Sequence, residues 1–186
     1  MANFKIFKPY GMLSQFVNNQ SRRRNKRLLG ELGDFPEGIM AVGRLDQDSE
    51  GLLFLTTDGK FSYEITSTGI EKEYWAQVDG IATDAQVKQL SEGLEISIHG
   101  KAYQTKACKV SLMTPPAGLP KRAKDIRNEN EHGDTSWLSI KLTEGKYRQV
   151  RKMTAKVGLP TLRLIRYRIG EETIEDMQAE EVRKLS

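Results

Sequence analysis

The stretch GRLDQDSEGLLFLTTDG, residues 43–59, organises the first half of the chain. It joins two apolar runs, 39–43 and 51–56, through the charged segment 44–50. Short apolar runs bounded by turn residues are typical of buried strands. Asp58 then predicts the start of a short helix, because an aspartate caps the free N–H groups of a first helical turn. We therefore expect two strands joined by a charged loop, a place where function is often found.

The composition excludes several classes of protein. The chain has 186 residues, enough for one ordinary domain. Its single cysteine, Cys108, rules out an intramolecular disulfide and a cysteine-built metal cluster, and we interpret it as a small core residue. His99 and His132 are each followed by glycine, which favours a turn over catalysis. No apolar run approaches the ~20 residues that span a bilayer, and no secretory signal is present, so we expect a soluble, cytoplasmic protein.

Charge is unevenly distributed along the chain. There are 29 Lys and Arg against 25 Asp and Glu, which gives a net charge of +4. Residues 171–186 hold six of the acidic side chains, and we interpret this tail as a solvated cap. The basic excess gathers at 22–27, which reads RRRNKR, and at 146–168, which has eight basic residues and no acidic one. Such segments favour a polyanion as partner, with a solvated face as the alternative.

Beyond the first loop, strands and helices mix without a regular alternation. Thr83 and Gln86 form a capping box that predicts a helix. A second helix is predicted at 147–157, ended by Gly158, and the segment 113–133 is one long loop. The expected strands cover 3–7, 72–79, 94–98, 102–112, 137–143 and 161–169. This mixture predicts an α+β fold with a largely antiparallel mixed sheet, flanking helices and two lobes that share one core.

The predicted helix 147–157 has two unlike faces. At about 100° per residue, Val150, Met153 and Val157 fall on one side. The opposite side carries four basic residues: Arg148, Arg151, Lys152 and Lys156. No carboxylate is available on this helix to neutralise them. We therefore expect the helix to pack through its apolar face and to offer a cationic row to a partner.

Conventional catalytic motifs are missing from the sequence. It has no GxxxxGK[ST] or GxGxxG phosphate loop, no CxxC or HExxH metal motif and no GxSxG nucleophile turn. Asp46, Asp48 and Glu50 alternate along the charged loop and superficially resemble a cation-binding loop. The interior glycine and final glutamate of an EF-hand are lacking. A metal-dependent nuclease is accordingly only a minor alternative.

Several segments occur in the order found in one enzyme family. They are Lys8–Gly11 (KPYG), Gly43–Gly59, Lys72–Tyr74, Leu142–Met153 (LTEGKYRQVRKM) and Gly158–Gly170 (GLPTLRLIRYRIG). Together they resemble the RsuA/RluB/RluE/RluF family of pseudouridine synthases over essentially the whole chain. The resemblance is strongest to a large-subunit member that lacks the S4 RNA-binding domain. We expect no S4 domain here, because the KPYG segment begins at residue 8.

The resemblance implies a fold, a reaction and a partner. The expected fold is the pseudouridine synthase catalytic domain over residues 1–186, with the active-site cleft between two lobes. The expected reaction detaches the uracil of a uridine from C1′, rotates it and rejoins it through C5, with no cofactor and no metal. The expected partner is 23S ribosomal RNA or a large-subunit precursor, and the chain is expected to be a monomer without an obligate protein partner. A non-catalytic RNA-binding or ribosome-assembly module is the alternative.

The resemblance also assigns three catalytic residues. Asp46 matches the catalytic carboxylate, which acts either through an adduct or by promoting a glycal. Arg151 matches the basic residue that pairs with this carboxylate and keeps its pKa low, with a phosphate contact as its alternative. Tyr74 matches the active-site tyrosine, which stacks on the uracil, and its alternative is a strand-core aromatic beside Trp75. Adjacent strand residues point to opposite faces, so only one of this pair is expected to face the site.

Further residues are expected to bind the RNA substrate. Arg44 matches an arginine that helps to displace the uridine from its helix, and its alternative is a structural ion pair with Asp48 or Glu50. Three basic residues are candidate contacts to the RNA backbone: Lys8, Arg148 and Lys152. The segments 20–27 and 113–133 are expected to share recognition of the RNA, because both are charged and lack periodicity.

Overall fold

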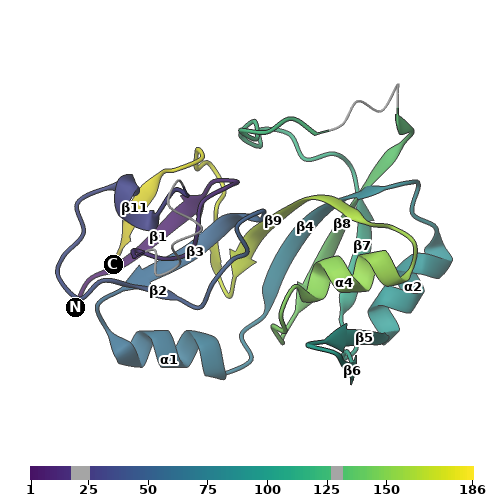
Figure 1. The fold of residues 1–186 in the computed structure, drawn as a ribbon, viewed down its shortest axis with the longest axis horizontal. Coiled ribbons are helices and arrows are strands. Elements are labelled where there is room, and N and C mark those ends of the chain that lie inside the picture. The colour runs from purple at the N-terminus through teal and green to yellow at the C-terminus, as the bar shows by residue number, and fades with distance from the viewer. Residues whose placement is uncertain (18–25, 127–131) are drawn as a thin grey trace. The chain divides into compact units, whose positions relative to one another are not determined.

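A computed structural model describes residues 1–17, 26–126 and 132–186 (Figure 1). The chain divides into two compact units. Unit 1 contains Met1–Ile70, Gly118–Lys124 and Arg166–Ser186, and unit 2 contains Glu71–Ala117 and Asp125–Ile165. Strand β9 (Thr161–Ile169) carries the chain from unit 2 into unit 1. No helix in the described ranges is long and apolar enough to cross a bilayer.

Unit 1 is built on antiparallel strands. Its main strands are β1 (Asn3–Lys8), β2 (Met40–Val42), β3 (Glu50–Thr56) and β11 (Val182–Leu185). Their order is β11-β1-β3, with β2 also paired to β3, and the short β10 (Glu172–Thr173) folds back on the end of β9. Every residue of β3 is buried. The strands expected at 3–7, 39–43 and 51–56 are thus confirmed.

Short helices complete unit 1. Helix α1 (Gly59–Ser67) begins where the sequence predicts, with the Asp58 carboxylate accepting a 2.9 Å hydrogen bond from the Lys60 backbone N–H. It contacts β2 and β3 (Figure 1). A 3-10 helix, η2 (Leu29–Leu32), covers the hydrophobic cluster of this unit. The fully buried members of that cluster are Ile6, Met12, Leu29, Leu53 and Leu55.

The acidic tail is part of the fold of unit 1, so its interpretation as a solvated cap is wrong. Strand β11 pairs antiparallel with β1, with Phe4 opposite Lys184. Upstream of this strand, the side chains of Ile174 and Met177 are buried. The ammonium of Lys5 lies 3.0 Å from the Glu172 carboxylate. The sparse apolar residues of the tail anchor it, while its carboxylates stay near the surface.

Unit 2 has a sheet in the order β4-β8-β7, and all its described pairs are antiparallel. The strands are β4 (Lys72–Asp79), β8 (Thr135–Leu142) and β7 (Lys109–Met113). Helices α2 (Asp84–Glu92) and α4 (Gln149–Lys156) share one hydrophobic cluster with this sheet, since Leu90 and Met153 pack with Val78 and Ile140. A separate hairpin joins β5 (Glu95–Ile98) to β6 (Lys101–Gln104). Helices, antiparallel strands and a hairpin in this arrangement confirm the α+β class.

The structure corrects two predicted boundaries in unit 2. The strand expected at 102–112 is divided into β6 and β7, because Thr105 and Cys108 donate backbone hydrogen bonds of 2.9 Å to the carbonyls of Leu94 and Ser91. The helix expected at 147–157 begins at Gln149, because Arg148 adopts a left-handed conformation with φ of +52°. Gly158, with φ of +83°, ends this helix as predicted.

Candidate functional site

The charged loop predicted at 44–50 connects β2 to β3 in unit 1. It begins at Gly43, whose φ of +66° turns the chain away from β2. The side chain of Asp46 is half-buried on this loop. Its own carbonyl accepts a 3.0 Å hydrogen bond from the Ser49 N–H, which closes a tight turn directly after the aspartate.

Hydrogen bonds fix the backbone on both sides of Asp46. On one side, the hydroxyl of Ser14 accepts from the Leu45 N–H at 3.0 Å and donates to the Leu45 carbonyl at 2.8 Å. On the other, the Gly11 N–H donates to the Gln47 carbonyl at 2.8 Å, and the Gln47 side-chain amide donates to the Gly11 carbonyl at 3.3 Å. The segment that follows β1 therefore holds the aspartate in one place, as a reacting carboxylate requires.

Lys8, at the end of β1, supports the same loop from inside the protein. Its side chain is fully buried, and its ammonium donates to the carbonyls of Pro9 at 2.9 Å, Met12 at 2.7 Å and Gln47 at 3.3 Å. Burial lowers the pKa of this group from 10.5 to about 7, although nearby carboxylates oppose the shift. A fully buried ammonium cannot reach an RNA backbone, so the expected contact of Lys8 with RNA is replaced by a role in holding the loop.

The residue after the loop must be a glycine. Gly51 has φ of +111°, and a Cβ built on it would lie 2.3 Å from the backbone oxygen of Arg166 in β9. Arg166 is itself buried, and its Nε donates to the Leu52 carbonyl at 2.8 Å. The start of β3 is thereby pinned between two neighbours, Lys8 in β1 and Arg166 in β9.

The other charged residues of the loop differ in exposure. Arg44 is exposed and, within the described part of the chain, pairs with neither Asp48 nor Glu50. Asp48 is half-buried, and Glu50 is buried at the first position of β3. Among residues 1–17, 26–126 and 132–186, no three His, Cys, Asp or Glu side chains are grouped so that they could hold a metal ion.

Tyr74 is the third residue of β4 in unit 2, opposite Ile140 of β8. Its half-buried ring packs against the hydrophobic cluster of this unit, at the end of the row that continues through Ala76. Trp75 points to the other face, as predicted, and its indole N–H donates to the Glu73 carboxylate at 2.7 Å. Tyr74 therefore has a structural contact in addition to any contact with substrate.

The remaining predicted residues lie at the start of α4. Arg148 is the residue before the helix, and its carbonyl accepts from the Lys152 N–H at 3.0 Å. Arg151, in the first turn, is half-buried. The Lys152 ammonium donates to the Ser97 carbonyl at 2.7 Å and lies 5.1 Å from the centre of the Tyr147 ring. The sequence predicts a row of exposed cations, but Arg148, Arg151 and Lys152 are each half-buried in unit 2.

Some of the expected RNA-binding residues lie outside the described ranges. These include Arg22, Arg23 and Arg24 of the RRRNKR segment and residues 127–131 of the long loop. Arg27, at the end of RRRNKR, is described, and its guanidinium forms ion pairs with Glu31 and Glu180. Part of this basic segment therefore serves the fold of unit 1.

Sequence reasoning missed two supporting residues. Ser14 holds Leu45 through both of its backbone polar groups, but no sequence pattern distinguishes it from other loop serines. Gln149 is buried, and its side-chain carbonyl accepts from the Lys146 N–H at 3.1 Å ahead of α4. Gln149 is the first residue of α4, and its bond back to Lys146 has no sequence signal, since the capping box requires a serine or threonine where this chain has Lys146.

Comparisons with known proteins agree on one family. Residues 5–156 match the family model described as RNA pseudouridylate synthase. A ribosomal large subunit pseudouridine synthase E of Vibrio vulnificus is 39% identical over 183 residues, covering 96% of this chain and 73% of the relative. A protein of the same name from Xanthomonas axonopodis pv. citri is 41% identical over 166 residues, covering 88% of this chain and 83% of the relative.

Solved structures give the same result for the fold. A crystal structure of a pseudouridylate synthase covers 100% of this chain and 70% of its own, with a TM-score of 0.75 and 25% identity. The match to a Cbf5-Nop10-Gar1 complex covers 95% of this chain and 51% of the other, with a TM-score of 0.57. At 12% identity this second likeness concerns the fold alone.

Proposed function

This chain belongs to the RNA pseudouridylate synthase family, and we propose that it isomerises a specific uridine of 23S ribosomal RNA. The reaction class follows from the family: the enzyme is an isomerase that makes pseudouridine in RNA. The choice of 23S RNA is supported by relatives named for the large ribosomal subunit at 39% and 41% identity. Ribosomal RNA as substrate also supports a cytoplasmic location.

Asp46 is the proposed catalytic carboxylate. The observation that carries this assignment is the fixed backbone around it, with Leu45 bonded to Ser14 and Gln47 bonded to Gly11. Isomerisation breaks the bond from C1′ to N1 and forms a bond from C1′ to C5, while C5 loses its proton to solvent and N1 gains one. A carboxylate held at the sugar can assist this by adding to C1′ or by taking a proton from the ribose.

Arg151 and Tyr74 are the proposed companions of Asp46, on the strength of the family resemblance. A guanidinium beside a carboxylate favours its ionised form, which is the form needed for either route. Tyr74 would stack on the uracil with the part of its ring that the hydrophobic cluster leaves uncovered. The active-site cleft between two lobes stays a prediction from the same resemblance.

Arg44 and Arg148 are the proposed contacts to RNA near the site. Arg44 is exposed on the loop of Asp46, which supports a role in filling the space that a displaced uridine leaves. Arg148 keeps its proposed contact with the RNA backbone. Moving a base-paired uridine out of its helix costs a few kcal/mol, whereas an unpaired uridine needs no such step. Loss of Arg44 should therefore slow turnover more on a base-paired target than on an unpaired one.

The proposed substrate is tested by mapping pseudouridines in ribosomal RNA from cells with and without this gene. We expect one position of 23S RNA to lose its pseudouridine in the deletion strain and to regain it when the wild-type gene is returned. Returning the Asp46→Ala gene should leave the uridine unmodified. An unchanged 23S map would contradict the proposed substrate, and restoration by Asp46→Ala would contradict the assignment of Asp46 as the catalytic carboxylate.

A further inference from the structure

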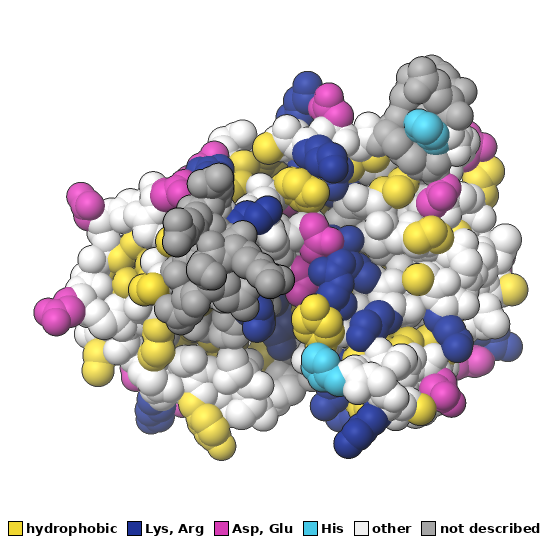
Figure 2. Space-filling view, viewed as in Figure 1, with side chains coloured by type: hydrophobic (Ala, Val, Ile, Leu, Met, Phe, Trp, Pro, Cys, Tyr) yellow, Lys and Arg dark blue, Asp and Glu magenta, His cyan; other side chains and the backbone are white. Residues whose placement is uncertain are grey.

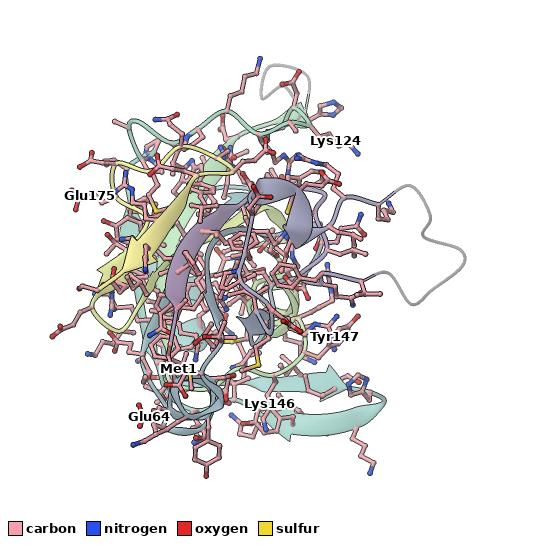
Figure 3. All side chains as sticks on the ribbon, turned by 90° about the vertical axis from the view of Figure 1, so that its left-hand side faces the viewer. Met1, Glu64, Lys124, Lys146, Tyr147 and Glu175 are labelled. Carbon is pink, nitrogen blue, oxygen red and sulfur yellow. The ribbon has the colours of Figure 1, made fainter. Side chains whose placement is uncertain are left out.

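An exposed group of aromatic and basic side chains lies on unit 2, formed by the β5–β6 hairpin and the turn before α4. The rings of His99 and Tyr147 are stacked, with their centres 5.2 Å apart and an angle of 22° between their planes. Tyr147 is 51% exposed although it is a large aromatic residue. Figure 3 labels Tyr147 and Lys146, which lie beside the β5–β6 hairpin. We call His99, Tyr147 and the lysines around them the stacking patch.

The hairpin presents His99 on a tight turn. Ile98 pairs with Lys101, so the turn consists of His99 and Gly100 alone. Both have positive φ, +49° and +80°, as a two-residue turn of this type requires. Asparagine followed by glycine would satisfy that backbone best, so the turn itself does not account for a histidine.

The turn that carries Tyr147 is held from inside. The Gln149 side chain accepts from the Lys146 N–H at 3.1 Å, and the Gln149 N–H donates to the Lys146 carbonyl at the same distance. Arg148 completes the turn in a left-handed conformation, which costs a non-glycine residue free energy. The tyrosine is therefore fixed in its outward position before any ligand arrives, which reduces the entropy lost on binding.

Lysines surround the stacked rings. Lys152 lies 5.1 Å from the centre of the Tyr147 ring, Lys146 lies 5.1 Å from that of Tyr103, and Lys101 is exposed in the hairpin. Figure 2 shows Lys and Arg side chains, in dark blue, over α4 and the hairpin. The nearby carboxylate of Glu144 is used internally, since it accepts from the Tyr103 hydroxyl and from the Lys106 N–H. The patch therefore keeps its positive character.

This combination matches one class of ligand. Aromatic faces bind unpaired bases by stacking, and adjacent lysines bind the phosphates between them. A base-paired strand would offer its phosphates but not its base faces. We propose that the stacking patch binds an unpaired nucleotide of the RNA substrate. The choice of RNA as ligand rests on the proposed function, whereas the stacking geometry does not.

The proposal is tested with oligoadenylate, which contains no uridine to occupy the catalytic site. Fluorescence anisotropy would compare its affinity for wild type, Tyr147→Ala and Tyr147→Phe. We expect Tyr147→Ala to weaken binding about five- to hundredfold, and Tyr147→Phe, which keeps the ring, to bind as wild type does. Removing the second ring, with His99→Ala, should weaken binding by a smaller factor.

Two controls make the result decisive. Tyr63→Ala removes a 70% exposed tyrosine from α1 in unit 1 and should leave the affinity unchanged. The duplex of oligoadenylate with oligouridylate should bind Tyr147→Ala and wild type alike. The proposal is overturned if Tyr147→Ala loses as much affinity for the duplex as for the single strand, or loses no more than Tyr63→Ala does. It is also overturned if wild type does not bind oligoadenylate. Failure of the proposed function would appear instead as an unchanged 23S map, independent of this assay.

Discussion

The loop that carries Asp46 and the turn that carries Tyr147 are both rigid, but they are held in different ways. The backbone of the Asp46 loop is bonded to residues more than thirty positions away, Ser14 and Gly11, with a buried lysine beneath it. The Tyr147 turn is held by its own neighbour, Gln149, and faces solvent. The first arrangement suits a carboxylate that must meet one atom of the substrate. The second suits a ring that receives any base.

The two regions also use positive charge differently. Lys8 is fully buried and its ammonium binds three carbonyls, so its charge serves the protein. Lys146 is exposed, so its charge is available to a phosphate. A basic segment in the sequence therefore does not by itself identify the residues that touch a polyanion. The following variants test this contrast, beginning with the largest expected effect.

Gly51→Ala should damage the Asp46 loop most. Its Cβ would lie 2.3 Å from the Arg166 carbonyl oxygen at a φ of +111°, so either β3 or β9 must shift. We expect a loss of about 3 kcal/mol in the free energy of unfolding and a Tm lower by about 10 °C. Gly59→Ala is the matched control, since a Cβ there meets no atom within 4 Å. Equal melting curves for the two variants would show that the close approach to β9 is not rigid.

Lys8→Met should lower turnover without removing an RNA contact. The carbonyls of Pro9, Met12 and Gln47 lose their donor, and displacement of the loop should reduce kcat about 10- to 100-fold. RNA affinity should stay unchanged in a binding assay. A large loss of RNA affinity with an unchanged kcat would instead support the direct contact between Lys8 and the RNA backbone that we expect from the sequence.

Lys8 should also make the free energy of unfolding depend on pH, and the variant Lys8→Met tests this. Burial lowers the pKa of Lys8 to about 7 in the folded state, against 10.5 in the unfolded state, so the unfolded chain binds more protons between these values. The contribution of Lys8 to stability should therefore rise with pH from about 7 to 10.5. Urea unfolding should show the stability of wild type rising relative to Lys8→Met over this range. A constant difference would contradict the shift.

Ser14→Ala should have a moderate effect. It removes both hydrogen bonds to Leu45, at 2.8 and 3.0 Å, and should cost about 1 kcal/mol of stability together with a several-fold loss in kcat. Ser62→Ala, at a half-buried serine within α1, provides the comparison. If both variants turn over RNA at the wild-type rate, the support around Leu45 is not needed for catalysis.

Arg27→Ala should have the smallest effect. Its guanidinium pairs with Glu31 and Glu180, but all three side chains are 42–48% exposed, and ion pairs at such positions contribute little. We expect a change in Tm below about 2 °C and an unaltered RNA affinity.

Lys146→Ala should instead weaken RNA binding and reduce its salt dependence by about one counterion. If Arg27→Ala weakened RNA binding and Lys146→Ala did not, the distinction between cations that serve the fold and cations that bind phosphate would be wrong.

Much of the fold could be predicted because its signals are local. The apolar run 51–56, the Asp58 cap and the end of α4 at Gly158 each depend on neighbouring residues, and all are found. The sequence does not predict strand β11, because its partner β1 lies at the other end of the chain and its four residues, VRKL, show no apolar alternation. The break between β6 and β7 depends on hydrogen bonds to Ser91 in α2 and to Leu94 just after it, which no local sequence pattern predicts.

The site was only partly predictable for a related reason. The position of Asp46 on a loop between strands follows from the sequence, since the turn and both apolar runs are explicit. The burial of Lys8 does not follow from the sequence, because a lysine close to proline and glycine is typical of an exposed turn. The stack of His99 on Tyr147 joins residues far apart in the chain, so only the folded structure brings their aromatic character together.

The role of Asp46 is tested most directly with RNA that carries tritium at C5 of its uridines. Formation of pseudouridine replaces this tritium with a proton and releases it to water, so released label measures turnover. Asp46→Asn keeps the size of the side chain and removes its charge. We predict that this variant binds the RNA as wild type does and releases no tritium. Release at a rate near that of wild type would contradict the assignment of Asp46 as the catalytic carboxylate.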